Sequence, residues 1–214
     1  MSHYFEPSDP VQPAELRQFE VRLAGAPAPV VSAAGVFSNG RLDLGTAVLL
    51  RAEDRLGTPA PTAGHLLDLG CGWGPIALSL ARLAPGAVVW AVDSNPRALQ
   101  LTALNAERLG LANVRPALPD AVPPGLQFDL LWSNPPIRIG KPALHQLLRR
   151  WLGRLRPGAH ADLVVQKNLG ADSLSRWLGA EPGWSVTKLA SAKGYRVIRA
   201  ARQSGGPDRQ PQGS

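Results

Sequence analysis

Short apolar runs alternate with segments of helical periodicity along most of this chain, and this alternation restricts the fold more than any other feature. Continuous runs of Val, Leu and Ala are typical of strands that a parallel sheet buries on both faces. Four such runs are predicted strands: 66–69, 88–92, 128–132 and 161–165. Three helices are predicted between them: 76–83, 96–109 and 142–155. The order predicts an α/β fold with a mostly parallel sheet.

The segments on either side of this alternation have a different pattern. Ahead of it, residues 19–23 and 29–32 can pair as a short hairpin, and residues 43–56 form a predicted helix. After it, a helix near 172–178 is followed by two strand-like runs, 184–189 and 195–200. The close spacing of these two runs favours an antiparallel hairpin at one edge of the sheet.

We expect one domain over residues 17–202, in which residues 17–64 precede the alternating core, because 214 residues with 44% apolar content suit one substantial core. Residues 1–16 and 203–214 are polar or Pro-rich without periodicity, so a mobile N-terminal segment and a disordered tail are predicted. No apolar run approaches the roughly 20 residues that span a bilayer, and the chain does not start like a signal peptide. We therefore expect a cytoplasmic protein. The single cysteine, Cys71, forms no internal disulfide, and the four histidines lack metal-ligand spacing, so no metal is expected.

The positive charge of the chain is concentrated in its last part. Residues 1–64 have a net charge of −2 and residues 65–130 a net charge of −1, whereas residues 131–214 carry +10. This asymmetry suggests that one side of the fold meets a polyanion such as a nucleic acid. The alternative is a general bias towards arginine, since Ala, Gly and Pro are also abundant.

The run DLGCGWG at 68–74 follows a predicted strand and opens a helix, which is where α/β folds bind nucleotide-like cofactors. A dinucleotide-binding loop would need its third glycine at position 75, which is Pro75. A carboxylate at Asp68 would repel a pyrophosphate but suits the ammonium of an amino-acid moiety. These features favour S-adenosylmethionine over a nicotinamide dinucleotide, with Gly70, Gly72 and Gly74 letting the backbone approach the cofactor.

Two further acidic residues follow later strands of the predicted sheet. Asp93 ends the strand after the glycine loop, at about the distance where an acidic residue accepts hydrogen bonds from ribose hydroxyls. Asp120 follows a weak predicted strand around Val114 and is a candidate acceptor for the adenine amine. Together with the loop, these residues predict a complete cofactor site.

The tetrapeptide Asn134-Pro135-Pro136-Ile137 follows the strand FDLLWS, at the sheet edge where open α/β folds bind their ligands. A planar amine such as guanine N2 is a poor nucleophile until its hydrogens are held. The Asn134 side-chain oxygen and the Pro135 carbonyl could each accept one N–H and aim the lone pair at a methyl group. No strong base is needed, because a sulfonium is already an activated methyl donor, and catalysis would consist mostly of positioning.

Several cations lie close to this motif in the sequence. Arg138 and Lys141 follow it directly, and Lys167, Lys193 and Arg196 lie near predicted strand ends or turns that could border the same pocket. All five are candidate RNA contacts. The arginines at 149, 150, 154 and 156 are more typical of a solvated helix face.

Taken together, these motifs resemble the small single-domain relatives of bacterial 16S ribosomal RNA guanine-N2 methyltransferases, which are class I methyltransferases. Besides the two motifs above, the resemblance includes HYF at 3–5, GVFS at 35–38, LDLGT at 42–46 and VVQK at 164–167. It implies a Rossmann-like, seven-stranded fold with an antiparallel edge hairpin. It also implies S-adenosylmethionine contacts at Asp68, Gly70, Gly72, Asp93 and Asp120, and catalysis at Asn134 with Pro135 and Pro136. Phe37 would lie near the cofactor or the target base, and the partner would be ribosomal RNA or the small ribosomal subunit.

The sequence departs from the family pattern at one position of the motif. Many nitrogen methyltransferases carry Phe or Tyr after the two prolines, where the ring stacks on the target, whereas this chain has Ile137. Because base–aromatic stacking contributes about 1–3 kcal/mol per base, another residue such as Phe37 must stack, or the target is held differently. The amino-terminal domain of the larger relatives has no counterpart here, which leaves the selection of the RNA open.

Three other interpretations remain at this point. The same motif serves adenine N6 methylation and glutamine methylation in release factors, although the basic carboxyl-terminal part favours RNA. The chain could also be a non-catalytic RNA-binding module, which the combination of Asp68, Asp93 and Asn134 argues against. A nicotinamide oxidoreductase fits least well, because of the glycine spacing. The sequence does not distinguish a monomer from a homodimer.

Overall fold

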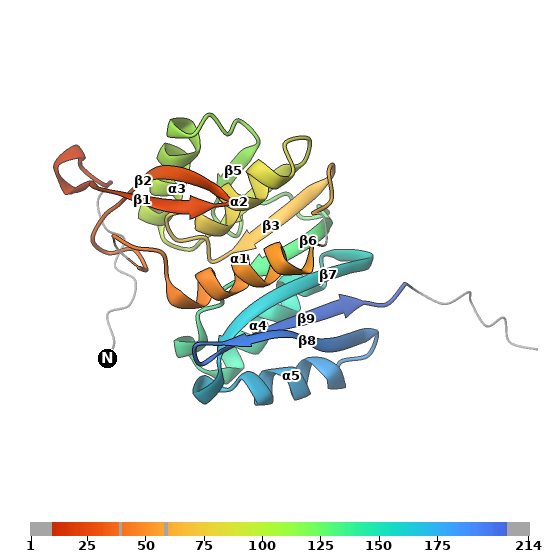
Figure 1. Cartoon of the computed structure of the whole chain (residues 1–214). Coiled ribbons are helices and arrows are strands. Elements are labelled where there is room, and N and C mark those ends of the chain that lie inside the picture. Colours follow the sequence, from red (N-terminus) through yellow and green to blue (C-terminus); the bar gives the residue numbers. More distant parts are fainter. Residues whose placement is uncertain (1–9, 39, 58–59, 205–214) are drawn as a thin grey trace, which may run out of the picture.

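The computed structural model describes residues 10–38, 40–57 and 60–204, and its centre is a seven-stranded sheet with the order β5-β4-β3-β6-β7-β9-β8 (Figure 1). The strands of this sheet are β3 (His65–Leu69), β4 (Val88–Val92), β5 (Val114–Ala117), β6 (Phe128–Ser133), β7 (Leu155–Gln166), β8 (Trp184–Ala192) and β9 (Tyr195–Arg202). β3 to β7 run parallel, and β9 pairs antiparallel with both β7 and β8. The predicted mostly parallel sheet with an antiparallel edge hairpin is confirmed.

Helices cover both faces of this sheet, which explains why its inner strands are mostly apolar. The helices are α1 (Leu44–Leu56), α2 (Pro75–Leu83), α3 (Pro96–Arg108), α4 (Lys141–Leu152) and α5 (Ala171–Ala180). One core forms where α1, α2 and α3 pack on the sheet, and a second forms under α4 and α5 (Figure 1). α2, α3 and α4 each have proline in the first turn, where its missing N–H has no intrahelical partner to lose. No helix of the described residues is long and apolar enough to span a membrane.

The topology gathers the sequence motifs at one edge of the sheet. Parallel strands end together, so the loops that follow β3, β4 and β6 all leave from their carboxyl ends. β9 starts at this same edge, because Tyr195 pairs with Gln166 at the end of β7. The glycine loop, Asp93, the Asn-Pro-Pro motif and the β8–β9 turn therefore share one side of the molecule.

The helix before β7 is shorter than its periodicity predicts. α4 ends at Leu152, and Leu155 already belongs to β7, where it pairs with Phe128. Gly153 ends the helix, and the register of β6 and β7 shifts between Phe128 and Leu130. Leu155 fits the apolar helical pattern because it is fully buried, but its burial comes from the sheet.

The chain ahead of the sheet contributes a separate two-stranded hairpin of β1 (Arg17–Leu23) and β2 (Ala26–Ser32). Residues 10–16, part of the predicted mobile segment, make ordered contacts with α3. The Val11 N–H donates to the Gln100 side chain at 2.7 Å, and Glu15 pairs with Arg97 at 2.6 Å. At the other end, the Gln203 N–H donates to the Gly183 carbonyl. Residues 1–9 and 205–214 lie outside the described residues.

Asn105 joins the hairpin to the rest of the fold. Its fully buried amide accepts from the Val31 N–H at 2.8 Å and donates to the Val31 and Trp73 carbonyls at 2.9 Å each. One side chain on α3 thus satisfies backbone groups of both β2 and the glycine loop.

Replacing Asn105 with Ala leaves those three backbone groups without their partner. A buried unsatisfied group costs about 1–3 kcal/mol, so we expect the free energy of unfolding to fall by at least about 2 kcal/mol. Urea denaturation measures it, with the exposed amide of Gln127 truncated by Gln127→Ala as the matched control. Equal stability of the two variants would contradict this role for Asn105.

Candidate functional site

The glycine loop forms a tight turn between β3 and α2. Gly70, Gly72 and Gly74 all have positive φ, at 78°, 57° and 96°, which side chains rarely allow. The Gly70 N–H donates to the Val92 carbonyl at 2.7 Å, and the Gly74 N–H closes the turn onto the Cys71 carbonyl at 2.9 Å. The loop is therefore anchored at both ends while its middle lies along the carboxyl edge.

Side chains of α3 support the loop from below. The Thr102 hydroxyl donates to the Gly72 carbonyl at 3.0 Å, and a Cβ added to Gly74 would lie 3.0 Å from the Thr102 side chain. Only glycine lets α3 approach this closely. Neither Thr102 nor Asn105 has a signal in the sequence beyond being a polar residue in an apolar helix face.

Asp68 lies at the end of β3, directly before the loop, and is completely buried. One carboxylate oxygen accepts from the Ala77 N–H at 2.9 Å, whereas the other has no hydrogen-bond partner among the described residues. Burial raises the pKa of Asp68 to about 8, an effect that the Ala77 hydrogen bond only partly offsets and the nearby Asp93 charge adds to. A buried oxygen without a partner is a group that a cation such as an ammonium would satisfy.

Asp93 connects the end of β4 to the glycine loop. Its two oxygens accept from the Gly72 N–H at 3.0 Å and the Asn95 N–H at 2.9 Å. Desolvation raises the pKa of Asp93, and these hydrogen bonds counteract the rise. The Asn95 side chain in turn donates to the Gly35 carbonyl at 2.9 Å, which ties the segment before α1 to the same place.

Phe37 extends from that segment with 67% of its surface exposed. Its backbone carbonyl would lie 3.9 Å from a Cβ on Gly72, so it lies beside the glycine loop. The structure thus brings Phe37, Asp68, Asp93 and the loop together, as the sequence predicts.

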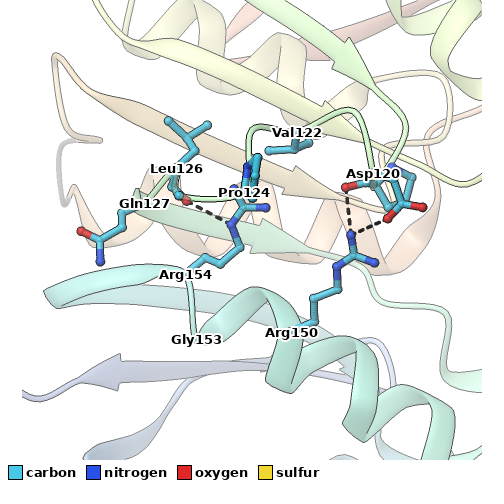
Figure 2. Close-up of a pocket in the computed structure, with 10 residues that line it drawn as sticks. Asp120, Val122, Pro124, Leu126, Gln127, Arg150, Gly153 and Arg154 are labelled. Carbon is cyan, nitrogen blue, oxygen red and sulfur yellow. Dashed lines mark hydrogen bonds and ion pairs between the residues drawn. The ribbon is translucent and has the colours of Figure 1, made fainter.

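Asp120 does not join this group. Its side chain is 91% exposed and pairs at 2.7 Å with Arg150, in the last turn of α4, at the opposite end of the helix from the Asn-Pro-Pro motif. Figure 2 shows this pair at a pocket of about 530 Å³ between the 119–127 loop and the end of α4. Only the Oδ1 atom of Asp120 accepts from Arg150, so the other carboxylate oxygen can still accept a hydrogen bond and the contact with adenine stays a prediction. The ion pair was not predictable from local sequence patterns, because the two residues are 30 positions apart.

The Asn-Pro-Pro motif forms a compact turn at the end of β6. The Ile137 N–H donates to the Pro135 carbonyl at 2.8 Å, and Pro136 has φ −74° and ψ 75°, the values of an inverse γ-turn. Proline fixes this φ, so the second proline holds the turn rigid. The Pro135 carbonyl therefore already accepts one hydrogen bond, and an amine would have to use its remaining lone pair.

The amide of Asn134 has a defined orientation. Its nitrogen lies 2.7 Å from a carboxylate oxygen of Asp43 and 3.1 Å from the Thr46 hydroxyl. A carboxylate can only accept, so the atom facing Asp43 is the NH2 group. No described residue donates to the amide oxygen, which remains the acceptor that Asn134 can present to a ligand.

Asp43 and Thr46 belong to the LDLGT run, which has no role predicted from its sequence beyond the start of α1. Asp43 also caps α1, accepting from the Thr46 N–H at 3.1 Å, so one carboxylate holds both the start of α1 and the Asn134 amide. The helix-start signal at Asp43 was readable from the sequence, but its second partner lies 91 residues away.

The predicted RNA-binding cations occupy the same edge but differ in their surroundings. Arg138 and Lys141 are exposed directly after the motif. Lys167 and Lys193 are exposed where the Lys167 N–H donates to the Gly194 carbonyl, at the β8–β9 turn. Arg196 instead forms an ion pair with Asp172 on α5. No group of three or more His, Cys, Asp or Glu within the described ranges is placed to hold a metal.

The chain is similar to several known proteins. A family model described as methyltransferase small domain matches residues 27–199. The chain is 32% identical to the uncharacterized protein YbxB of Bacillus subtilis (strain 168), over 94% of this chain and 100% of that protein. It is 36% identical to the ribosomal RNA small subunit methyltransferase C of Pseudomonas entomophila (strain L48), over 86% of this chain and 54% of that enzyme.

A solved structure gives the same picture. The T. thermophilus 16S rRNA N2 G1207 methyltransferase, in complex with AdoMet and guanosine, has a TM-score of 0.78 and 29% sequence identity, over 91% of this chain and 52% of that one. The chain thus spans about half the length of these ribosomal RNA methyltransferases.

The raised pKa of Asp68 predicts that the stability of the protein depends on pH. A carboxyl group with a pKa near 8 when folded and near 4 when unfolded favours folding while protonated, and this contribution is lost as pH rises from about 4 to about 8. Asp68→Asn keeps an acceptor for the Ala77 N–H but cannot ionise. Because 1 kcal/mol shifts the Tm of such a domain by about 2–4 °C, we expect the variant to gain at least about 3 °C relative to wild type between pH 6 and pH 8.5.

The same variant tests the fit of the cofactor. S-adenosylmethionine should raise the Tm of the wild type, and this rise should be lost in Asp68→Asn if an ammonium satisfies the orphan oxygen. If the Tm values of the two proteins changed with pH in parallel, the raised pKa of Asp68 would be contradicted. If S-adenosylmethionine raised the Tm of Asp68→Asn as much as that of the wild type, the contact between Asp68 and the ammonium would be contradicted.

Proposed function

Since this chain belongs to the methyltransferase small domain family, we propose that it transfers a methyl group from S-adenosylmethionine to the exocyclic N2 amine of a guanine in small-subunit ribosomal RNA. The observation that carries this proposal is the Asn134 amide, whose NH2 group is held by Asp43 and Thr46 so that its oxygen is left as the acceptor. An acceptor fixed next to a cofactor loop suits an amine substrate.

The residues of the cofactor site fit S-adenosylmethionine. Asp68 offers a buried oxygen without a partner, the glycine loop turns tightly after it with Gly70 exposed, and Asp93 is the acceptor proposed for the ribose hydroxyls, next to the Gly72 N–H. S-adenosylmethionine supplies a methyl group on a positively charged sulfur, which is activated for transfer without a strong base. The remaining work of the protein is to hold the acceptor in place.

Asn134 and Pro135 perform that work in this proposal. The lone pair of guanine N2 is delocalised into the ring, so the amine must be held in a geometry that frees it. The Asn134 oxygen accepts one N–H, and the Pro135 carbonyl uses its second lone pair for the other. The inverse γ-turn fixes the Pro135 carbonyl, and Asp43 fixes the amide, so little reorganisation is left at the moment of transfer.

The choice of ribosomal RNA over a protein acceptor rests on charge and on the relatives. Residues 131–214 carry a net charge of +10, and Arg138, Lys141, Lys167 and Lys193 are exposed on the edge that bears Asn134. Two of the similar proteins are named as small-subunit ribosomal RNA methyltransferases, and one of these two is named as a guanine N2 enzyme. Such a substrate would place the enzyme in the cytoplasm, acting on the RNA or on the assembled subunit.

Transfer from isotopically labelled S-adenosylmethionine to unmodified small-subunit RNA and to assembled subunits tests the proposal, with the products separated by nucleoside mass spectrometry. We expect label in N2-methylguanosine with the wild type and none with Asn134→Ala. Label in N6-methyladenosine would show that the methyl acceptor is adenine N6 and not guanine N2. Label in glutamine of an added release factor and in no RNA would move the activity to protein.

The orienting role of Asp43 can be separated from its capping role. Asp43→Ser keeps a good helix cap but is too short to hold the Asn134 amide. We expect kcat for methyl transfer to fall by about 10- to 100-fold, the scale on which misplaced groups act, while the affinity for S-adenosylmethionine changes by less than about twofold.

Asp54→Ser is the matched control, because Asp54 is an exposed carboxylate on the same helix. It should leave both constants unchanged. A normal kcat for Asp43→Ser would contradict the orienting role, and an equal loss in both variants would trace the effect to α1 as a whole.

A further inference from the structure

Ile137 leaves the motif without an aromatic ring, yet a target base held by Asn134 needs an apolar face to lie against. Most aromatic side chains of the described residues cannot provide one. Trp73, Phe128, Trp132 and Trp151 are buried, and Trp184 starts β8 at the opposite edge of the sheet. Three further rings already pack on another aromatic side chain: Phe19 on Trp73, Trp90 on His65, and Trp177 on His145.

Two rings of the described residues remain at the carboxyl edge, Phe37 and Tyr195. Phe37 lies beside the glycine loop, with its carbonyl next to Gly72, and so belongs to the cofactor side of the site. Tyr195 is the first residue of β9 and lies on the side of the Asn-Pro-Pro motif, next to the Asp43 carboxylate that orients Asn134.

Gly45 shows how close Tyr195 lies to that group. A Cβ added to Gly45 would lie 2.8 Å from Cε1 of the Tyr195 ring and 3.0 Å from the Asp43 carboxylate oxygen. That oxygen accepts from the Asn134 amide at 2.7 Å. The Tyr195 ring, the Asp43 carboxylate and the Asn134 amide therefore lie next to one another in space at the start of α1. The ring can pack there because position 45 is glycine.

We propose that Tyr195 is the aromatic wall of the acceptor site, on which the target purine stacks while the Asn134 oxygen holds its exocyclic amine. This inference rests on the proposed function and names the residue that takes the place of the ring missing at 137. The site then has an aromatic side chain on each flank, Phe37 towards the cofactor and Tyr195 towards the motif.

The surroundings of the Tyr195 hydroxyl support this role. Burial and the charge of Asp43 raise its pKa, and Arg138 lowers it only in part, so the hydroxyl stays protonated at physiological pH and can donate a hydrogen bond. Arg138 is exposed and close enough for its charge to lower the Tyr195 pKa, so it can pair with the phosphate of a nucleotide whose base stacks on the ring. Tyr195 is half-buried, and its ring packs on the start of α1 at Gly45.

The probe for this inference is 2-aminopurine riboside, a fluorescent purine with an exocyclic amine at position 2, whose emission is quenched by stacking. Protein saturated with S-adenosylhomocysteine is titrated into it. We expect saturable quenching with the wild type and with Tyr195→Phe. For Tyr195→Leu we expect affinity for the riboside to fall by about 5- to 100-fold, as for the loss of one base–aromatic stack.

Two further variants separate stacking from a structural effect. Trp184→Leu removes an aromatic ring from the other end of the same hairpin and should quench like the wild type. Ile137→Phe in the Tyr195→Leu background returns a ring to the motif and should restore part of the quenching. The Tm shift with S-adenosylmethionine, unchanged in Tyr195→Leu, shows that the cofactor site is intact.

The outcomes for this inference and for the proposed function can be told apart. Wild-type quenching in Tyr195→Leu, or no quenching in the wild type, overturns the stacking role even if N2-methylguanosine is formed. Quenching that depends on Tyr195 upholds the role even if the methylated product proves to be a different nucleoside.

Discussion

The hydrogen bond from the Asn134 amide to the Asp43 carboxylate is the interaction on which the acceptor site depends. It spans 2.7 Å and joins two loops that are 91 residues apart in the chain. Asp43 is itself held in place by capping α1, and α1 packs against β7 and β9. The direction of one amide group is thereby fixed by the position of a whole helix on the sheet, and the lone pairs that face the ligand are set before any ligand arrives.

The cofactor side of the site is built on the same principle with different parts. Thr102 and Asn105, both buried on α3, hold carbonyls of the glycine loop, and Asp93 holds one of its N–H groups. These contacts fix the glycine loop at the carboxyl edge of the sheet. Asp68 is the exception, because it pairs on one oxygen only and is costly to ionise in the folded protein. The cost of ionising Asp68 is consistent with a carboxylate whose second oxygen gains a partner only when a cation binds.

Much of this arrangement could be predicted from the sequence, because it depends on local patterns. The apolar runs gave the strands, the glycine spacing gave the loop, and strand polarity placed Asp93 and Asn134 at one edge. The contacts that decide orientation were not predictable, since they join residues distant in the chain. The pairing of Asp43 with Asn134, the turn of Asp120 towards Arg150 and the packing of Tyr195 on Gly45 all depend on how helices and strands meet. Residues 10–16 show the same limit, since a polar segment without periodicity is ordered by individual contacts with α3.

The most direct test of the account is a crystal structure of the protein with S-adenosylhomocysteine and guanosine. We predict that the Asn134 NH2 group stays on Asp43 while the Asn134 oxygen lies within about 3 Å of the guanine N2 atom, the distance of an N–H···O hydrogen bond. This prediction would be contradicted if the guanine amine lay out of reach of Asn134, or if the amide had turned to present its nitrogen to the base.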